Sequence, residues 1–308
     1  MQLEPKYDLS LQKEATCNLI RRLLPRHHQF FRLEEFGNVH SQEAFEISSS
    51  DHQIILKGTG GVAWASALNW YLKYYCNVQF SWFNTAMRLP DKLPPVSEKI
   101  YRESPHAFRY YLNYCTFSYS MAWWNWSRWE QEIDWMALNG INMPLAVMGH
   151  EAIWQKLLLD FGFSNQEVYD FFSGPAYRAW GWMGNIENWG GPLPQSWIDD
   201  QMKLQKLILQ RERELGMTPV LHSFSGHVPQ KFKDLFPNAR ISQLPGWYGY
   251  PGNHFLDPTD PLFKELCSKY MKHQRELYDT DHFYTTDLFH EIDLPDNQKD
   301  KLNRISNA

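Results

Sequence analysis

The chain has 308 residues, which is long enough for two domains or for one large α/β domain with an appendage. Its net charge is −5 and no run of Lys or Arg exceeds two residues, so the electrostatic signature of a nucleic-acid or anionic-membrane binder is missing. No stretch approaches the roughly 18 apolar residues that a membrane span needs, and no apolar export signal follows Met1. We therefore predict no nucleic-acid partner and no membrane span.

The cysteine and aromatic content limits the possible functions further. The four cysteines have neither metal-ligand spacing nor the density of a disulfide scaffold, and we predict no metal and no cofactor. Aromatic residues are abundant, with 14 Trp, 16 Tyr and 19 Phe. Indole faces suit the C–H faces of sugar rings, so the aromatic set predicts a sugar-binding role. Core filling is the alternative for any single Trp.

Residues 1–104 are predicted to form a small α/β accessory domain. Apolar periodicity indicates two helices and three short strands, at 9–24 and 62–75 for the helices and 30–33, 44–48 and 53–57 for the strands. The following segment, RLPDKLPPVSEK at 88–99, is proline-rich and charged, which is typical of a linker. We place the domain boundary near Ser104.

Residues 105–308 alternate between strand and helix patterns. Two S-x-x-E capping boxes, Ser127–Glu130 and Ser164–Glu167, predict helix starts, and Gly140 follows the first helix as a C-terminal cap. Pro144 counts against full pairing of the second strand. The predicted strands are 107–118, 141–147, 217–224 and 282–288, and long helices are predicted at 196–215 and 262–278.

This alternation predicts a parallel sheet of about four strands. Four strands in roughly 190 residues would be the first half of a (β/α)₈ TIM barrel. A complete open, doubly wound sheet of four or five strands is the alternative.

Two sequence patterns suggest cofactor or metal sites. Gly58–Ala63 matches G-x-G-x-x-G/A after a strand, but residues 59–90 contain no Asp or Glu to hold a ribose, so a tight strand-to-helix turn is favoured. His-Glu occurs at His150-Glu151 and again at His290-Glu291, without the second His of H-E-x-x-H. A metal-dependent hydrolase, with His222 and His227 as further ligands, stays a minor alternative.

Glu291 is the third candidate, because it lies just beyond the C-terminal end of the fourth predicted strand. In a TIM barrel that end carries the active site. A carboxyl group beside aromatic and acidic residues can act as a general acid. The alternative is a solvated acid in a loop that also contains Asp293 and Asp296.

Three long segments and the short DLFHE resemble glycoside hydrolase family 89, the α-N-acetylglucosaminidases. They follow the family's order and lie at Arg109–Trp154, Phe171–Trp197, Gly216–Pro229 and Asp287–Glu291, and the first two are Trp-rich and include WWNWSRW and AWGWMGN. The resemblance covers the chain from about residue 15 to its end. It implies an N-terminal α/β domain, a (β/α)₈ barrel and a helical domain. It also implies exo-hydrolysis of terminal non-reducing α-linked N-acetylglucosamine in glycans, with retention, in a secreted, periplasmic or lysosomal setting.

The resemblance also assigns residues. The family's D-x-F-x-E motif makes Glu291 the general acid/base, and His290 stands where family members carry Asn. The motifs N-x-C, A-W-G-x-M-G-N and G-W place the sugar-binding side chains at Asn113, Cys115, Trp180, Met183 and Trp247.

The family's nucleophilic Glu belongs to a later barrel strand and has no counterpart up to Ala308. Because a retaining pair must lie about 5 Å apart, we expect the 308-residue chain alone to be inactive. A missing C-terminal portion, or a second copy in a homo-oligomer, would supply the rest. A non-catalytic sugar-binding module is the alternative from a different class.

Overall fold

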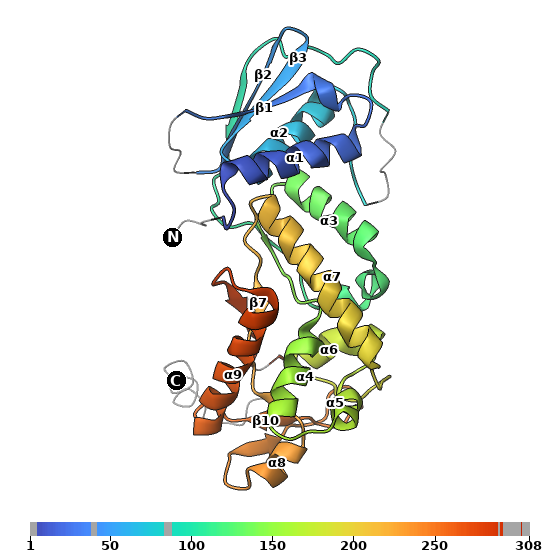
Figure 1. Cartoon of the computed structure of the whole chain (residues 1–308), viewed down its shortest axis with the longest axis vertical. Helices are drawn as coiled ribbons and strands as arrows, with labels where there is room; N and C mark the ends of the chain where they lie inside the picture. Colours follow the sequence, from blue (N-terminus) through green and yellow to red (C-terminus); the bar gives the residue numbers. More distant parts are fainter. Residues whose placement is uncertain (1–4, 38–41, 83–87, 289, 292–302, 304–308) are drawn as a thin grey trace. The chain divides into compact units, whose positions relative to one another are not determined.

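A computed structural model describes residues 5–37, 42–82, 88–288, 290–291 and 303. The chain divides into two compact units, and each is described by itself. Unit 1 comprises Met1–Tyr111, Asn125–Ala146 and Leu207–Val220, and unit 2 comprises Leu112–Trp124, Val147–Lys206 and Leu221–Ala308 (Figure 1).

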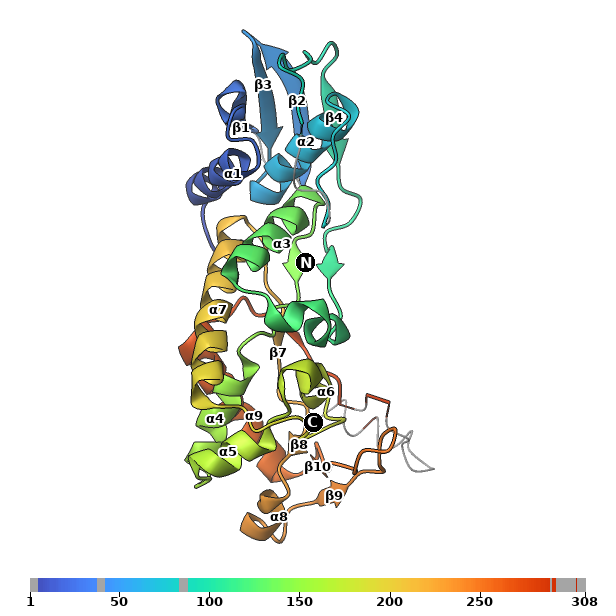
Figure 2. The ribbon, with the colours of Figure 1, turned by 90° about the vertical axis from the view of Figure 1, so that its right-hand side faces the viewer.

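The N-terminal part of unit 1 is a four-stranded sheet with helices packed on it. The strands lie in the order β1-β3-β2-β4, with β1 parallel to β3 and the other pairs antiparallel. Helix α2 packs against β2, β3 and helix α1 (Figure 2). The elements are α1 (Leu9–Leu23), η1 (His28–Phe30), β1 (Phe31–Glu35), β2 (Ala44–Ser50), β3 (Gln53–Gly58), α2 (Gly61–Tyr74) and β4 (Ile100–Glu103).

The glycines between β3 and α2 are explained by close packing. A Cβ atom on Gly61 would lie 2.3 Å from the carbonyl oxygen of Leu215, so no larger residue fits. The Gly61 N–H, one of the free donors at the start of α2, donates to Gln12 Oε1 at 2.9 Å. The turn is therefore filled by the protein's own side chains, which agrees with the predicted tight turn.

Helix α3 (Trp126–Leu138) begins slightly earlier than predicted. Its N-cap is Asn125, whose Oδ1 accepts from Arg128 N at 3.2 Å, so Ser127 lies inside the helix and caps nothing. Asn and Ser are comparable N-caps, and here the earlier residue takes the role. The predicted cap at Ser127 is wrong, whereas Gly140, with φ of +76°, follows the helix as predicted.

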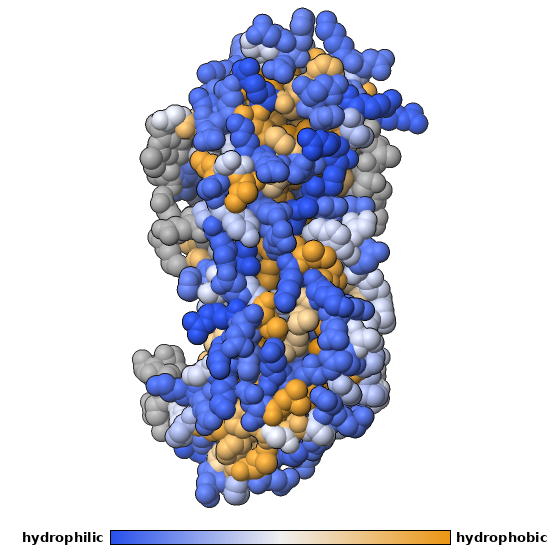
Figure 3. Space-filling view, in the orientation of Figure 1, coloured by the Kyte–Doolittle hydropathy of each residue, from blue (hydrophilic) through white to orange (hydrophobic). Residues whose placement is uncertain are grey.

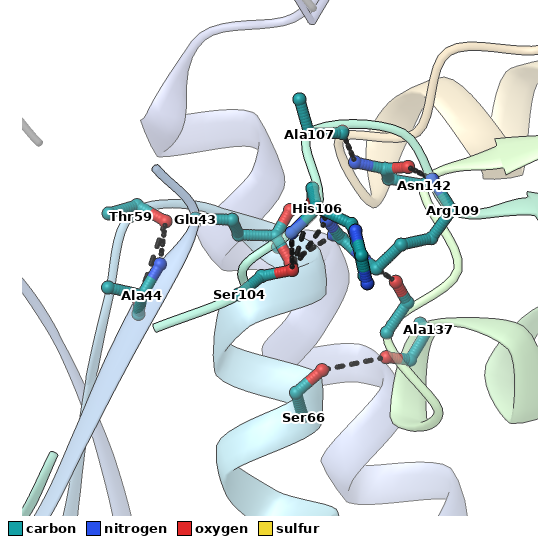
Figure 4. Close-up of polar contacts among 12 residues, drawn as sticks. Glu43, Ala44, Thr59, Ser66, Ser104, His106, Ala107, Arg109, Ala137 and Asn142 are labelled. Carbon is teal, nitrogen blue, oxygen red and sulfur yellow. Dashed lines mark hydrogen bonds and ion pairs between the residues drawn. The ribbon is translucent and has the colours of Figure 1, made fainter. Parts of the chain in front are cut away.

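Arg109 clamps the segment that leads into the parallel strands of unit 1 (Figure 4). Its Nη1 donates to His106 O at 2.7 Å, its Nη2 to Glu43 Oε1 at 2.5 Å, and its Nε to Gly140 O. Burial raises the pKa of Glu43, and the Arg109 guanidinium opposes that rise. Asn142 completes the clamp by donating from Nδ2 to Ala107 O at 2.9 Å. With these donors engaged inside the protein, the clamp serves the fold.

The predicted parallel strands are present, in the predicted order, but are short. β5 pairs in parallel with β6, Leu145 bridges in parallel to Val220, and β7 pairs in parallel with β11. Their bounds are β5 (Tyr110–Tyr111), β6 (Met143–Pro144), β7 (Leu221–His222) and β11 (Tyr284–Thr285). This succession is the one expected of consecutive barrel strands.

Pro144 remains compatible with β6 because its neighbours carry the pairing. The Leu145 N–H donates to Tyr111 O at 2.7 Å, and the Pro144 carbonyl accepts from Val220 N at 2.8 Å. Only the donor that proline lacks is lost. Pro144 therefore removes one hydrogen bond between the strands, as predicted, but the strand still forms.

Unit 2 also contains helices and a small antiparallel sheet in the order β8-β10-β9. The capping box of Ser164 and Glu167 opens α5 as predicted. The remaining elements are η2 (Cys115–Ser118), η3 (Ser120–Trp123), α4 (His150–Asp160), α5 (Asn165–Phe171), η4 (Pro175–Tyr177), α6 (Arg178–Trp182), α7 (Gln195–Glu214), β8 (His227–Val228), α8 (Lys231–Leu235), β9 (Ile241–Gln243), β10 (His254–Leu256) and α9 (Pro261–Tyr278).

On the face seen in Figure 3, hydrophilic side chains predominate and hydrophobic ones show between them. Among the residues that the structure describes, no helix combines the length and the apolar character that crossing a bilayer would require.

Candidate active site

Glu291 lies beyond the C-terminal end of β11, on a turn of unusual backbone conformation. Its φ is +50°, a left-handed value that costs a residue with a side chain about 1 kcal/mol. Its side chain is 52% exposed. One carboxylate oxygen, Oε2, accepts a hydrogen bond from Trp247 Nε1 at 2.8 Å. The carboxyl group is therefore both held and open to a ligand.

His290 is held on three sides beside this carboxyl group. Its Nδ1 lies 2.7 Å from Asp287 Oδ2, and its Nε2 lies 3.9 Å from Glu291 Oε1. Its backbone carbonyl accepts from Asn185 Nδ2 at 3.1 Å. Asp293 and Asp296 lie outside the described residues.

Trp247 belongs to an aromatic cluster beside Glu291. Its ring centroid lies 5.0 Å from that of Tyr248 and 6.1 Å from that of Tyr250, which in turn lies 5.0 Å from that of Trp189. Trp247 and Tyr250 also exchange backbone hydrogen bonds of 3.1 and 2.8 Å across a tight turn. Tyr248 is 84% exposed, so the cluster offers an accessible aromatic surface near the carboxyl group. Sequence reasoning found Trp247 and missed the other three.

Helix α6 and the residue that ends it supply two further predicted residues. Trp180 is partly exposed and contacts the ring of Tyr119 edge-on, with centroids 5.8 Å apart. Met183 is buried. The chain then turns at Gly184, whose φ of +77° favours glycine, and Asn185 N donates to Trp180 O at 2.8 Å. This turn brings the Asn185 side chain to His290. In the sequence, the only hint of this contact is that Asn185 ends the A-W-G-x-M-G-N motif.

Glu187, two residues further on, is a largely buried acid whose side chain is 19% exposed. Burial raises its pKa to about 7. Its Oε2 lies 3.5 Å from Nε2 of His227, whose pKa burial lowers to about 4, with His254 adding to the effect. The two groups are therefore both neutral between these pH values, which is the cheaper state for buried titratable groups.

Asn113 and Cys115 do not lie on a strand as predicted. The first barrel strand ends at Tyr111, and Asn113 Oδ1 accepts from Thr116 N at 3.3 Å, which favours a turn over an extended chain. Cys115 then starts the short helix η2. Between them, Tyr114 donates its hydroxyl to Thr285 Oγ1 at 3.4 Å, so this turn lies beside β11.

The predicted site residues thus fall into two groups. Direct contacts join Trp247, His290 and Glu291, and Asn185 ties the turn of Met183 to them. Asn113 and Cys115 are linked to Trp180 and β11 indirectly, through neighbours such as Tyr114 and Tyr119 and through the bond from Ala179 N to Ser118 Oγ at 2.8 Å.

A second polar cluster in unit 2 is buried. Arg178 Nε lies 3.0 Å from Glu151 Oε1, and the same oxygen accepts from Trp182 Nε1 at 3.0 Å. The guanidinium also lies over the Trp182 ring, 4.9 Å from its centroid. Arg178 and Glu151 are each only 3% exposed, so this is a paired interior charge rather than an accessible site.

Three of the four histidines named as metal candidates, His150, His222 and His227, line this buried region, whereas His290 lies beside Glu291. The rings of His150 and His222 are 4.7 Å apart, and burial lowers both pKa values, that of His222 to about 4. Arg178 carries a positive charge into the same cavity of about 30 Å³. Within the described residues, no group of three or more His, Cys, Asp or Glu side chains could hold a metal ion.

Comparison with known families identifies both parts of the chain. Residues 109–308 match the model of the alpha-N-acetylglucosaminidase (NAGLU) TIM-barrel domain, and residues 14–95 match that of the alpha-N-acetylglucosaminidase N-terminal domain. The barrel model covers well over half of the chain. It decides between the two predicted architectures in favour of the barrel.

Individual relatives agree. The chain is 42% identical over 260 residues to alpha-N-acetylglucosaminidase from Homo sapiens, a match that covers 83% of this chain and 35% of the human protein. A family 89 glycoside hydrolase from Clostridium perfringens, solved with 2-acetamido-1,2-dideoxynojirmycin, superposes with a TM-score of 0.91 at 33% identity, covering 96% of this chain and 35% of that chain.

A second Clostridium perfringens structure, CpGH89, has two glutamates replaced by glutamine and is in complex with its substrate GlcNAc-α-1,4-galactose. It superposes with a TM-score of 0.87 at 34% identity, covering 94% of this chain and 34% of that chain. The chain thus spans about a third of the length of the relatives it matches.

Proposed function

Because the chain belongs to the α-N-acetylglucosaminidases of glycoside hydrolase family 89, we propose that its protein is a retaining exo-glycosidase that removes terminal non-reducing α-linked N-acetylglucosamine from glycans. Residues 1–104 would form an accessory α/β domain, and residues 105–308 would belong to the catalytic barrel.

Glu291 is the proposed general acid/base. In the first step its proton passes to the glycosidic oxygen while the bond from that oxygen to the anomeric carbon breaks, and a second carboxylate attacks that carbon. In the second step a water molecule attacks the anomeric carbon and displaces the second carboxylate, while the Glu291 carboxylate takes a proton from that water. The half-exposed carboxyl group and the indole donor on Oε2 support this role, because Oε1 is left to face a substrate.

The remaining predicted residues are proposed to bind the sugar. The indoles of Trp180 and Trp247 offer apolar faces with a polar edge, which suits a sugar ring. The exposed amide of Asn113 would hydrogen-bond hydroxyl groups. Cys115, Met183 and His290 would complete the wall of the pocket.

The observation that carries the proposal is the contact between Trp247 and Glu291. Two family motifs that lie 44 residues apart in the sequence assign these residues separately, and they meet at 2.8 Å. A catalytic acid beside a sugar-binding indole is the arrangement that exo-hydrolysis requires, since the acid must reach the bond next to the bound ring.

The partner carboxylate is proposed to lie outside residues 1–308. A retaining enzyme needs two carboxyl groups about 5 Å apart, and the family's nucleophile belongs to a later barrel strand. The 308-residue chain alone is therefore proposed to bind sugar without hydrolysing it. Normal turnover by the purified 308-residue chain would contradict this.

The test is Glu291→Gln in the protein expressed from its complete reading frame, with an aryl α-N-acetylglucosaminide as substrate. Loss of general acid/base catalysis is expected to lower kcat at least 10²-fold. Unchanged turnover would rule out the assigned role. Calorimetric binding of N-acetylglucosamine without hydrolysis by the parent protein would instead favour the sugar-binding module.

A further inference from the structure

The backbone around Glu291 is held in a conformation that it would not adopt by itself. A left-handed φ is uncommon for a residue with a side chain, and such conformations persist where the surrounding structure fixes them. The direction in which the Glu291 side chain leaves the backbone depends on this conformation. The groups that fix the turn therefore decide where the carboxyl group lies.

Asn185 is the contact best placed to fix it. Its Nδ2 donates to the carbonyl oxygen of His290, and that carbonyl shares one planar peptide unit with the nitrogen of Glu291. The bond thus sets the orientation of the peptide plane from which Glu291 departs. The Asp287 contact reaches only the His290 ring, and the Trp247 bond reaches only the carboxylate.

Asn185 is itself immobilised. It is 4% exposed, and its own N–H donates to Trp180 O. The preceding carbonyl, of Gly184, accepts from Asn253 Nδ2 at 2.9 Å. The His290 carbonyl can only accept, so the donor end of the Asn185 amide must face it, and the side chain cannot be flipped. A rigid turn, the one that carries Trp180 and Met183, thereby reaches the backbone beside Glu291.

We propose that Asn185 is a positioning residue for the general acid: it locks the peptide between His290 and Glu291 so that the carboxyl proton is aimed at the leaving-group oxygen of a sugar bound against Trp180 and Met183. The inference rests on the proposed function and deepens it. Asn185 exchanges no proton and forms no bond with the substrate. It acts only through Glu291.

The test uses leaving groups of different basicity, because a poor leaving group needs the proton of the general acid and a good one does not. Asn185→Ala and the nearly isosteric Asn185→Asp are made in the protein expressed from its complete reading frame. We expect kcat/KM to fall about 10- to 100-fold with a methyl or phenyl α-N-acetylglucosaminide. With the 2,4-dinitrophenyl analogue the fall should be less than about 5-fold.

Asn142→Ala is the matched control. Asn142 is equally buried, at 5% exposure, and its amide also donates to a backbone carbonyl remote in sequence, that of Ala107. Any loss in this variant should be the same for both substrates. Equal losses for both substrates in the Asn185 variants, or no loss, would overturn the proposal.

The Glu291→Gln background separates this inference from the proposed function. There, Asn185→Ala should add no further discrimination between the two leaving groups, because the acid it positions is gone. If Glu291→Gln shows no preference for the activated substrate, the proposed function fails. If Glu291→Gln shows that preference and the Asn185 variants do not, only the positioning role fails.

Discussion

The two His-Glu pairs of this chain have opposite surroundings. Glu151 and Glu291 each follow a histidine, and each accepts a hydrogen bond from an indole N–H, that of Trp182 at 3.0 Å and that of Trp247 at 2.8 Å. Glu151 is 3% exposed and paired with Arg178, whereas the side chain of Glu291 is 52% exposed and has no Arg or Lys ion pair among the described residues.

The two carboxylates differ in burial and in whether a guanidinium neutralises their charge. The Glu151 carboxylate is buried and ion-paired with a guanidinium, so a substrate in solution does not reach it, and the pair belongs to the interior of the fold. A carboxylate that is anchored at one oxygen and open at the other can exchange a proton with a ligand. The His-Glu dipeptide is the same at both sites, so the surroundings, and not the dipeptide, separate the structural glutamate from the candidate catalytic one.

The largest stability effect is expected at the buried pair. Glu151→Gln keeps the shape of the side chain but leaves the Arg178 guanidinium buried without a counter-ion, which typically costs about 3–5 kcal/mol. Chemical denaturation at neutral pH would measure this as a loss in the free energy of unfolding. A loss below about 1 kcal/mol would show that the pair does not stabilise the interior.

Two further variants make the comparison sharper. Glu291→Gln should change the free energy of unfolding by less than about 0.5 kcal/mol, because its side chain is half exposed. The double replacement Glu151→Leu with Arg178→Met removes both charges together and should recover much of the stability that Glu151→Gln loses. If the double variant recovers no stability, the loss in Glu151→Gln comes from altered packing rather than from an unpaired charge.

Glu187 is the next largest effect, and it depends on pH. Its folded-state pKa of about 7 exceeds its ordinary 4.5, so between these values the folded protein binds more protons than the unfolded chain. Stability from this group is therefore present below pH 4.5 and is lost as pH rises through 7. Glu187→Gln should be more stable than the parent at pH 8, by about 3 kcal/mol, and nearly equal to it at pH 4.

Urea denaturation at the two pH values would measure this difference. His227 has the opposite dependence, because its lowered pKa makes the folded state prefer higher pH between about 4 and 6.5, but it is present in both proteins and largely cancels. Glu98→Gln, at an exposed glutamate, should change stability little at either pH. An equal effect of Glu187→Gln at both pH values would contradict the raised pKa.

The sequence predicted the fold well where local rules decide it. The helix at 262–278 and the capping box of Ser164 were correct, because apolar spacing and side-chain capping act over a single turn. The strand at 107–118 was too long, because alternation cannot show that Asn113 closes a turn on Thr116. At the start of α3, Asn125 and Ser127 can both act as N-caps, and the S-x-x-E pattern indicated Ser127 instead of Asn125.

The site was predictable only as far as family motifs reach. Strand position and resemblance both indicated Glu291, but neither indicated that Trp247 would donate to its carboxylate across 44 residues. Asn185 lay within a recognised motif and was still missed, since its partner is a backbone carbonyl and carries no sequence signal. Contacts between distant segments follow from the packed chain, and no local pattern encodes them.

The smallest predicted effect separates the two indole donors. In the protein expressed from its complete reading frame, Trp247→Phe keeps an aromatic wall and removes only the N–H that holds Glu291 Oε2. Because that carboxylate is half exposed, we expect kcat/KM on an aryl α-N-acetylglucosaminide to fall about 5- to 10-fold, the equivalent of about 1 kcal/mol. Its stability should be unchanged. Trp182→Phe is the matched variant: it removes the N–H that serves buried Glu151, and should lower the free energy of unfolding by about 1.5–3 kcal/mol. If Trp182→Phe lowers kcat/KM on this substrate as much as Trp247→Phe does, without loss of stability, then Glu151 belongs to the chemistry as well, and the distinction between the two glutamates is wrong.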